Sequence, residues 1–98
     1  MSIYVVATVQ ILDQEMMEEY SAIASPMVAK FGGEYVAVSA SPPEVVEGEW
    51  AMEAQTFIMK FPSREDFYGF WNSPEYERAK EIRKGKAILN NVILDEMG

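Results

Sequence analysis

One arginine has the side chain and the position to bind a substrate. Arg83 lies near the end of the second predicted helical region, from where its guanidinium could reach a cleft. A planar guanidinium can hold a carboxylate or an enolate oxygen with two parallel hydrogen bonds. Arg83 is therefore a candidate catalytic residue that orients an oxyanion. The alternative is a structural ion pair within the chain, for example with Glu75.

Aromatic residues recur where they could surround such a ligand. A phenol can donate a hydrogen bond or a proton to a bound oxygen, so Tyr76 is the second candidate catalytic residue. Trp71, Tyr35 and Tyr20 are candidate ligand-binding residues that would form the walls of an aromatic pocket. The alternative is that these rings fill the core and an interface, with each polar tip hydrogen-bonded to a neighbour.

Glu75 completes the candidate ligand-binding residues. It could act as a base if it were buried beside an apolar wall. The alternative is that a glutamate in the first turn of a helix stabilises the helix dipole. Ser73 and Ser63 are predicted to be helix N-caps and not nucleophiles, because the sequence has no histidine to activate them.

The composition excludes several kinds of chemistry. The chain contains no cysteine and no histidine, so it has no thiolate nucleophile, no imidazole base and no zinc site of the usual kind. A haem held by histidine is excluded as well. We therefore predict a protein that uses no cofactor and binds no transition metal.

The charge of the chain bears on its partners, and the apolar run near its start bears on its location. Sixteen acidic residues against eight basic ones give a net charge of −8, which disfavours nucleic acid and anionic membrane surfaces as partners. The apolar run from Ile3 to Leu12 has no basic leader and is too short to span a bilayer. We read it as a β-strand and expect a cytoplasmic protein.

Alternation and helical periodicity predict the elements of the first half of the chain. The strand from Ile3 to Leu12 precedes a helix with Asp13 as its N-cap. Gly32-Gly33 ends this helix. A second strand follows over residues 34–40, and after a break at two prolines residues 44–47 can resume it briefly. The apolar stripe of the helix consists of Met16, Tyr20, Ile23, Met27 and Phe31.

The second half repeats this pattern. A third strand covers residues 54–61, two helical segments begin after Ser63 and Ser73, and a last strand covers residues 87–95. The order β-α-β-β-α-β predicts a single α+β domain over residues 1–98 with the ferredoxin-like topology. In this fold a four-stranded antiparallel sheet carries its helices on one face. The half-apolar opposite face, with Tyr4 and Val6, predicts a partner, and hence a homodimer.

Several segments resemble one protein family. They are Phe61-Pro62-Ser63, the run from Phe70 to Tyr76, Arg83, the run from Lys30 to Tyr35, and the run from Val46 to Trp50. In this order they resemble the family called domain of unknown function 1330, within the dimeric α+β barrel superfamily. The resemblance covers nearly the whole chain. It implies a homodimer whose two sheets face each other as a barrel.

The resemblance also bears on function. Relatives in the superfamily include cofactor-independent monooxygenases, cyclases and isomerases, while no activity is established for the family itself. The resemblance implies a homodimer that binds a small molecule. It also implies a cofactor-independent enzyme of one of these types, which acts on a small cyclic or aromatic carbonyl compound. The alternative is a non-catalytic module for ligand binding or dimerisation.

Overall fold

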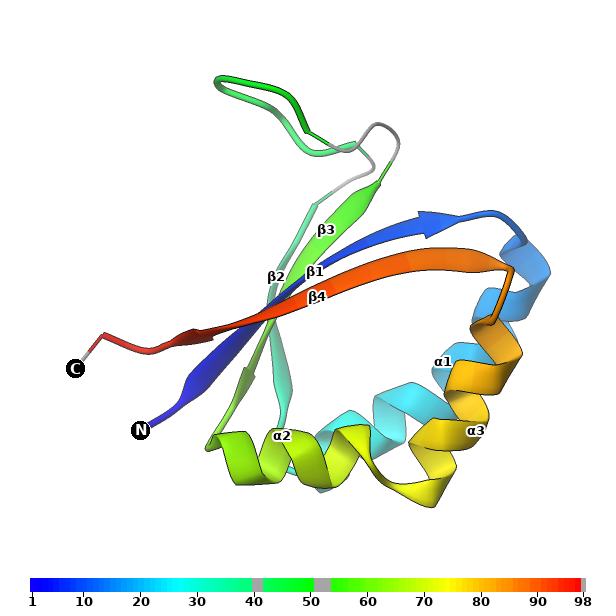
Figure 1. Ribbon diagram of the computed structural model, residues 1–98, viewed down its shortest axis with the longest axis vertical. Helices are drawn as coiled ribbons and strands as arrows, with labels where there is room; N and C mark the ends of the chain where they lie inside the picture. Colours follow the sequence, from blue (N-terminus) through cyan, green and yellow to red (C-terminus); the bar gives the residue numbers. More distant parts are fainter. Residues whose placement is uncertain (40–41, 51–53, 98) are drawn as a thin grey trace.

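The computed structural model describes residues 1–39, 42–50 and 54–97. The elements follow one another in the order predicted, and the second helical region consists of two helices (Figure 1). In chain order they are β1 (Ile3–Ile11), α1 (Gln14–Lys30), β2 (Glu34–Val38), β3 (Gln55–Phe61), α2 (Arg64–Trp71), α3 (Pro74–Arg83) and β4 (Ala87–Asp95).

The strands form one antiparallel sheet in the order β2-β3-β1-β4. All three helices lie on the same side of this sheet, so the predicted ferredoxin-like fold is confirmed (Figure 1). The central strand β1 shows why one face is covered. Its residues alternate strictly, with Ile3, Val5, Ala7 and Val9 buried and the residues between them half-buried, because successive side chains of a strand point to opposite faces.

The core lies between this sheet and the helices. Phe61, at the end of β3, is 0% exposed. The centroid of its ring is 5.3 Å from that of Phe67 and 5.6 Å from that of Phe70, both on α2. The backbone of Gly33 also packs against the Phe61 ring, because a Cβ atom at position 33 would lie only 2.7 Å from it. Phe61 thus anchors α2 and the end of α1 to the sheet.

The helices begin at the caps that the sequence predicted, and α1 ends at the predicted glycine. Asp13 accepts a hydrogen bond from the backbone N–H of Glu15, and Ser63 accepts one from that of Asp66. Ser73 caps α3 in the same way. Gly32 follows α1 with a φ of 80°, the left-handed conformation that glycine adopts at least cost. No helix in the described ranges is long and apolar enough to cross a membrane.

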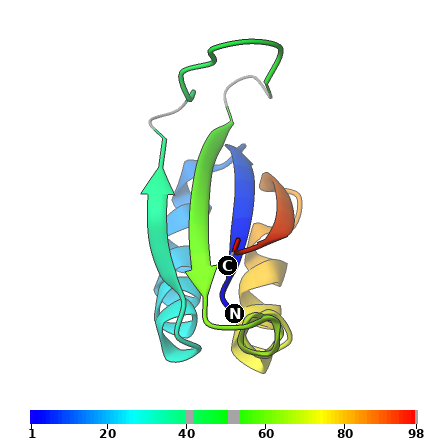
Figure 2. The same cartoon turned by 90° about the vertical axis from the view of Figure 1, so that its left-hand side faces the viewer.

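The connection between β2 and β3 differs from the prediction. Residues 42–50 form no strand, so the expected resumption at residues 44–47 is wrong. They form a loop that projects beyond the end of the sheet (Figures 1 and 2). Val46 is 94% exposed there, and an apolar residue without a packing partner gains nothing from the extended conformation. The predicted strand residue Ala40 lies outside the described residues.

Replacement of Phe61 tests the role of this ring as an anchor. Phe61→Ala removes a fully buried ring that packs against Phe67 and Phe70, and should lower the free energy of unfolding by about 3–5 kcal/mol. Val46→Ala is the matched control, because a change at an exposed loop position should cost less than about 0.5 kcal/mol. Urea unfolding at one fixed protein concentration measures both. Equal losses in the two variants would contradict this account of the core.

Candidate functional site

A cavity of about 190 Å³ lies between the inner face of the sheet and the helices. Its walls are mostly apolar, with aliphatic and methionine side chains from both layers. The polar groups that reach it include Tyr20 on α1, Tyr76 and Arg83 on α3, and Tyr35 on β2. An apolar cavity with a few convergent polar groups is the usual form of a small-molecule site.

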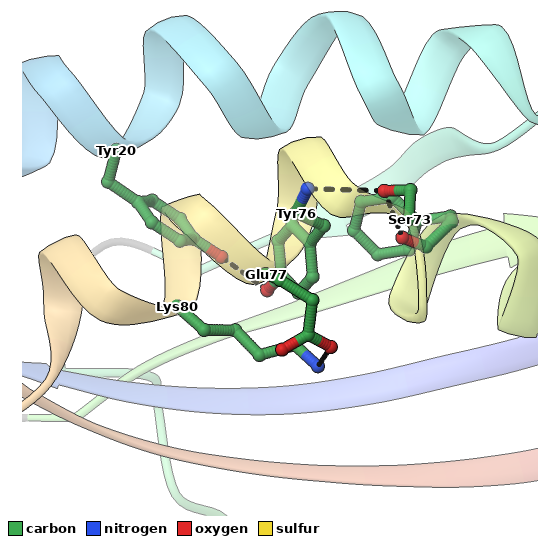
Figure 3. Close-up of polar contacts among 6 residues, drawn as sticks. Tyr20, Ser73, Tyr76, Glu77 and Lys80 are labelled. Carbon is green, nitrogen blue, oxygen red and sulfur yellow. Dashed lines mark hydrogen bonds and ion pairs between the residues drawn. The ribbon is translucent and has the colours of Figure 1, made fainter.

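Two tyrosines join the helices over this cavity. The hydroxyl oxygens of Tyr20 and Tyr76 are 2.6 Å apart, and either one can be the donor (Figure 3). Tyr76 is only 3% exposed. Burial, and then the neighbouring Tyr76 hydroxyl, raise the pKa of Tyr20 far above the usual range. Tyr20 therefore keeps its proton at neutral pH and does not act as a base.

Arg83 brings a positive charge to the same cavity. Its guanidinium carbon is 6.0 Å from the centroid of the Tyr20 ring. Its Nε atom is buried and has no hydrogen-bond partner. In the described part of the chain the ion pairs join Lys60 to Glu96, Arg64 to Asp95 and Lys80 to Glu77. Arg83 is in none of them, so no described carboxylate neutralises it.

Aromatic rings form the rest of the site. The ring of Trp71, the last residue of α2, lies 5.4 Å from that of Tyr76 between centroids. The ammonium group of Lys80 covers Trp71 at 4.2 Å from its ring centroid. The same group pairs with Glu77 at 2.9 Å (Figure 3). Tyr35 packs beside Phe57, with 5.8 Å between their ring centroids. Partial burial raises the pKa of Tyr35.

The structure thus brings together most of the residues that the sequence singled out. Tyr20, Tyr35, Trp71, Tyr76 and Arg83 all line the cavity, whereas Glu75 is not part of its lining.

The predicted helix caps also take their expected places. Glu75 lies in the first turn of α3, where a negative charge stabilises the helix dipole. Ser73 accepts a hydrogen bond from the backbone N–H of Tyr76 at 3.1 Å and donates one to the carbonyl of Phe70 at 2.8 Å. These bonds confirm it as a cap (Figure 3).

Two amide side chains of the site escaped the sequence analysis. Asn91 on β4 and Gln55 on β3 both line the cavity. The sequence could have indicated Asn91, because alternation along the last strand places it on the same face as Leu89 and Ile93. Gln55 opens β3, and its side chain donates to the Ser39 carbonyl at 3.2 Å. Alternation along this strand likewise places Gln55 on the same face as Phe57 and Met59.

The chemistry of the lining favours a bound anion. It contains a guanidinium and phenols but, within the described residues, no aspartate or glutamate. Such a site stabilises negative charge on an oxygen and supplies no strong base for removing a proton. The described residues also hold no group of three or more acidic side chains that could bind a metal ion.

Comparison with known proteins identifies the family. Residues 2–97 match the model of the family described as Domain of unknown function (DUF1330). The chain belongs to this family. No curated protein matches it.

Solved structures show that the fold of this DUF1330 protein recurs. A protein of unknown function from Rhodopseudomonas palustris is 17% identical, with a TM-score of 0.82 over 99% of this chain and 83% of that one. A dimeric ferredoxin-like protein of unknown function from Jannaschia sp. CCS1 is 13% identical, with a TM-score of 0.72 over 98% and 100%. The cofactor-independent oxygenase SnoaB from Streptomyces nogalater is 9% identical, with a TM-score of 0.67 over 99% and 94%. At these identities the likeness concerns the fold.

The raised pKa of Tyr20 predicts how the stability of this DUF1330 protein depends on pH. Above the ordinary tyrosine pKa of 10.0, an unfolded chain loses this proton while the folded chain keeps it. Stability therefore falls as the pH rises beyond that value. Tyr20→Phe removes this effect together with the hydrogen bond to Tyr76. We expect the wild type to be more stable than the variant at about pH 8 and to lose this advantage towards about pH 11.

Urea unfolding of both proteins at the two pH values measures this difference. All other ionisable groups are common to wild type and variant, so the comparison reports on Tyr20 and its hydrogen-bond partner Tyr76. A stability difference that stays constant across the range would contradict the placement of this phenol.

Proposed function

We propose that this DUF1330 protein is a homodimer that binds a small aromatic or cyclic carbonyl compound, in its anionic form, in the cavity beside Arg83. The observation that carries the proposal is the Arg83 guanidinium, which lines an apolar cavity and whose buried Nε atom has no partner. A guanidinium without an acceptor is costly to bury. A carboxylate or enolate oxygen in the cavity would bind it with charge-assisted hydrogen bonds.

The neighbouring phenols support the same ligand class. Tyr20 and Tyr76 share one hydrogen bond, and because a hydroxyl can donate only once, one of the two protons remains available. Together with Arg83 these phenols supply hydrogen-bond donors to the lining of the cavity. A cavity of about 150 Å³ accommodates benzene, so 190 Å³ suits a single ring with a substituent.

Catalysis without a cofactor is the second part of the proposal. A donor cluster that binds an enolate more tightly than the parent ketone lowers the energy needed to form the enolate. Arg83 would orient the oxyanion and Tyr76 would donate to it, while Trp71, Tyr35 and Tyr20 form the walls. The fold of SnoaB, described as a cofactor-independent oxygenase, is compatible with such chemistry. A non-catalytic binding module remains the rival, and turnover of bound compounds separates the two.

The outer face of the sheet supports the homodimer. Val6 is paired with Val92 on β4 and with Ile58 on β3, so three aliphatic side chains lie side by side on this face. Val92 is 56% exposed, and Leu94 and Ile88 on the same strand are about equally exposed. Two such faces can pack against each other at about 10 Å. The protein from Jannaschia that shares this fold is described as dimeric.

The mass in solution tests the dimer. At micromolar concentration, light scattering should give about twice the chain mass of 11.1 kDa. Val92→Glu places a charge among the exposed aliphatic side chains of the outer face and should shift the protein towards the monomer. Val46→Glu, in the projecting loop, is the control and should leave the mass unchanged. A monomeric wild type would contradict the proposed assembly.

The role of Arg83 is tested with cinnamate, a single-ring carboxylate. Arg83→Met keeps most of the stem and removes the charge, and should lower the affinity for cinnamate by roughly 1.5–3 kcal/mol. Its free energy of unfolding should change by less than about 1 kcal/mol, because no described carboxylate is left unpaired. Calorimetric titration and urea unfolding measure the two effects.

Two controls sharpen this test. Arg78→Met removes an exposed charge from the same helix, outside the cavity lining, and should leave both quantities unchanged. Cinnamamide has no negative charge and should be insensitive to Arg83→Met. A loss of stability of about 3–5 kcal/mol in Arg83→Met would instead assign Arg83 to a buried structural pair.

A further inference from the structure

Asn91 is a polar residue on an otherwise apolar row of β4. Alternation along the strand places it with Leu89 and Ile93 on the face that meets the helices. No hydrogen bond involves its side-chain amide within the described part of the chain. Its neighbour Asn90, on the outer face, donates to the Thr8 hydroxyl at 3.3 Å. The Asn91 amide therefore has donors and an acceptor free on the cavity side.

The surroundings of Asn91 leave room for a ligand. Asn91 lines the cavity between the sheet and the helices. Asn91 also borders a second hollow, together with Phe67, Trp71 and Ile93. The amide thus lies where the cavity reaches α2, beside aromatic residues that include Tyr68, and it forms no hydrogen bond with a described side chain.

Arg83 and Asn91 lie towards opposite ends of the cavity. Arg83 ends α3, and its carbonyl accepts a hydrogen bond at 3.0 Å from the N–H of Lys86, which immediately precedes β4. From Ala87 to Asn91 the strand advances by about 13 Å. The chain reverses direction between α3 and β4, so Asn91 returns to the level of α2, where α3 begins.

We propose that Asn91 hydrogen-bonds to a second polar group of the ligand, at the end remote from the anionic oxygen. This inference rests on the proposed function and narrows its ligand class. The ligand is an elongated, flat anion whose charged oxygen binds at Arg83 and whose far end carries a hydroxyl or carbonyl group. A site built to hydrogen-bond such a group discriminates against analogues that lack it.

Cinnamate and 4-hydroxycinnamate test this inference, because they differ only in a hydroxyl at the end remote from the carboxylate. Wild type should bind 4-hydroxycinnamate about fivefold more tightly than cinnamate. Asn91→Leu should abolish this preference and leave the affinity for cinnamate within about twofold of wild type. Arg83→Met should weaken both compounds by a similar factor and preserve the preference. Calorimetric titration gives all six affinities.

Asn90→Leu is the matched control, since it makes the same change one residue away on the opposite face. It should retain the fivefold preference, and thermal melts verify that both leucine variants are folded. Equal affinity of wild type for the two compounds, or an equal loss for both in Asn91→Leu, would overturn the inference and leave the proposed function intact. Failure of both compounds to bind wild type would overturn the proposed function, and this inference with it.

Discussion

The hydrogen bond between Tyr20 and Tyr76 links two helices that are far apart in the sequence and side by side over the sheet. It spans 56 residues of chain and joins α1 to α3 at 2.6 Å. Both helices must lie on one face of the sheet, because the two β-α-β crossovers have the same hand. The bond fixes their separation on the side that faces the sheet. The cavity and the surroundings of Arg83 follow from that separation.

The electrostatics of the site are local. The chain as a whole has a net charge of −8, so its overall field repels an anion. Among the described residues that line the cavity, however, Arg83 carries the charge, and its Nε atom is shielded from water. A charge in a poorly solvated site acts more strongly over a few ångströms than surface charges do across water. In the proposed site, selectivity for an anion would therefore come from Arg83 and the phenols, in spite of the acidic surface.

Local patterns in the sequence predicted the fold well. Alternation in β1, the caps Asp13 and Ser73, and the stop at Gly32 depend on neighbouring residues only, and each is found where it was expected. Val45 and Val46 have high strand propensity but lie in a loop, because strand formation depends on a packing partner.

The site was less predictable, because it depends on contacts across the fold. The sequence named Tyr20 and Tyr76 but could not show that their hydroxyls meet. Nor could it show that Glu75 lies outside the cavity or that Asn91 faces into it.

The alternation of β4 links the proposed site to the proposed assembly. Asn91 contributes to the cavity, and the next residue, Val92, contributes to the outer apolar face. A shift of β4 by one residue would exchange the two faces. A second sheet packed on Val92 would favour the present register, since a slip would bring Asn91 into an apolar interface. Dimerisation would then do more than cover exposed aliphatic side chains. It would hold Asn91 on the cavity side of the sheet, at a fixed distance from Arg83.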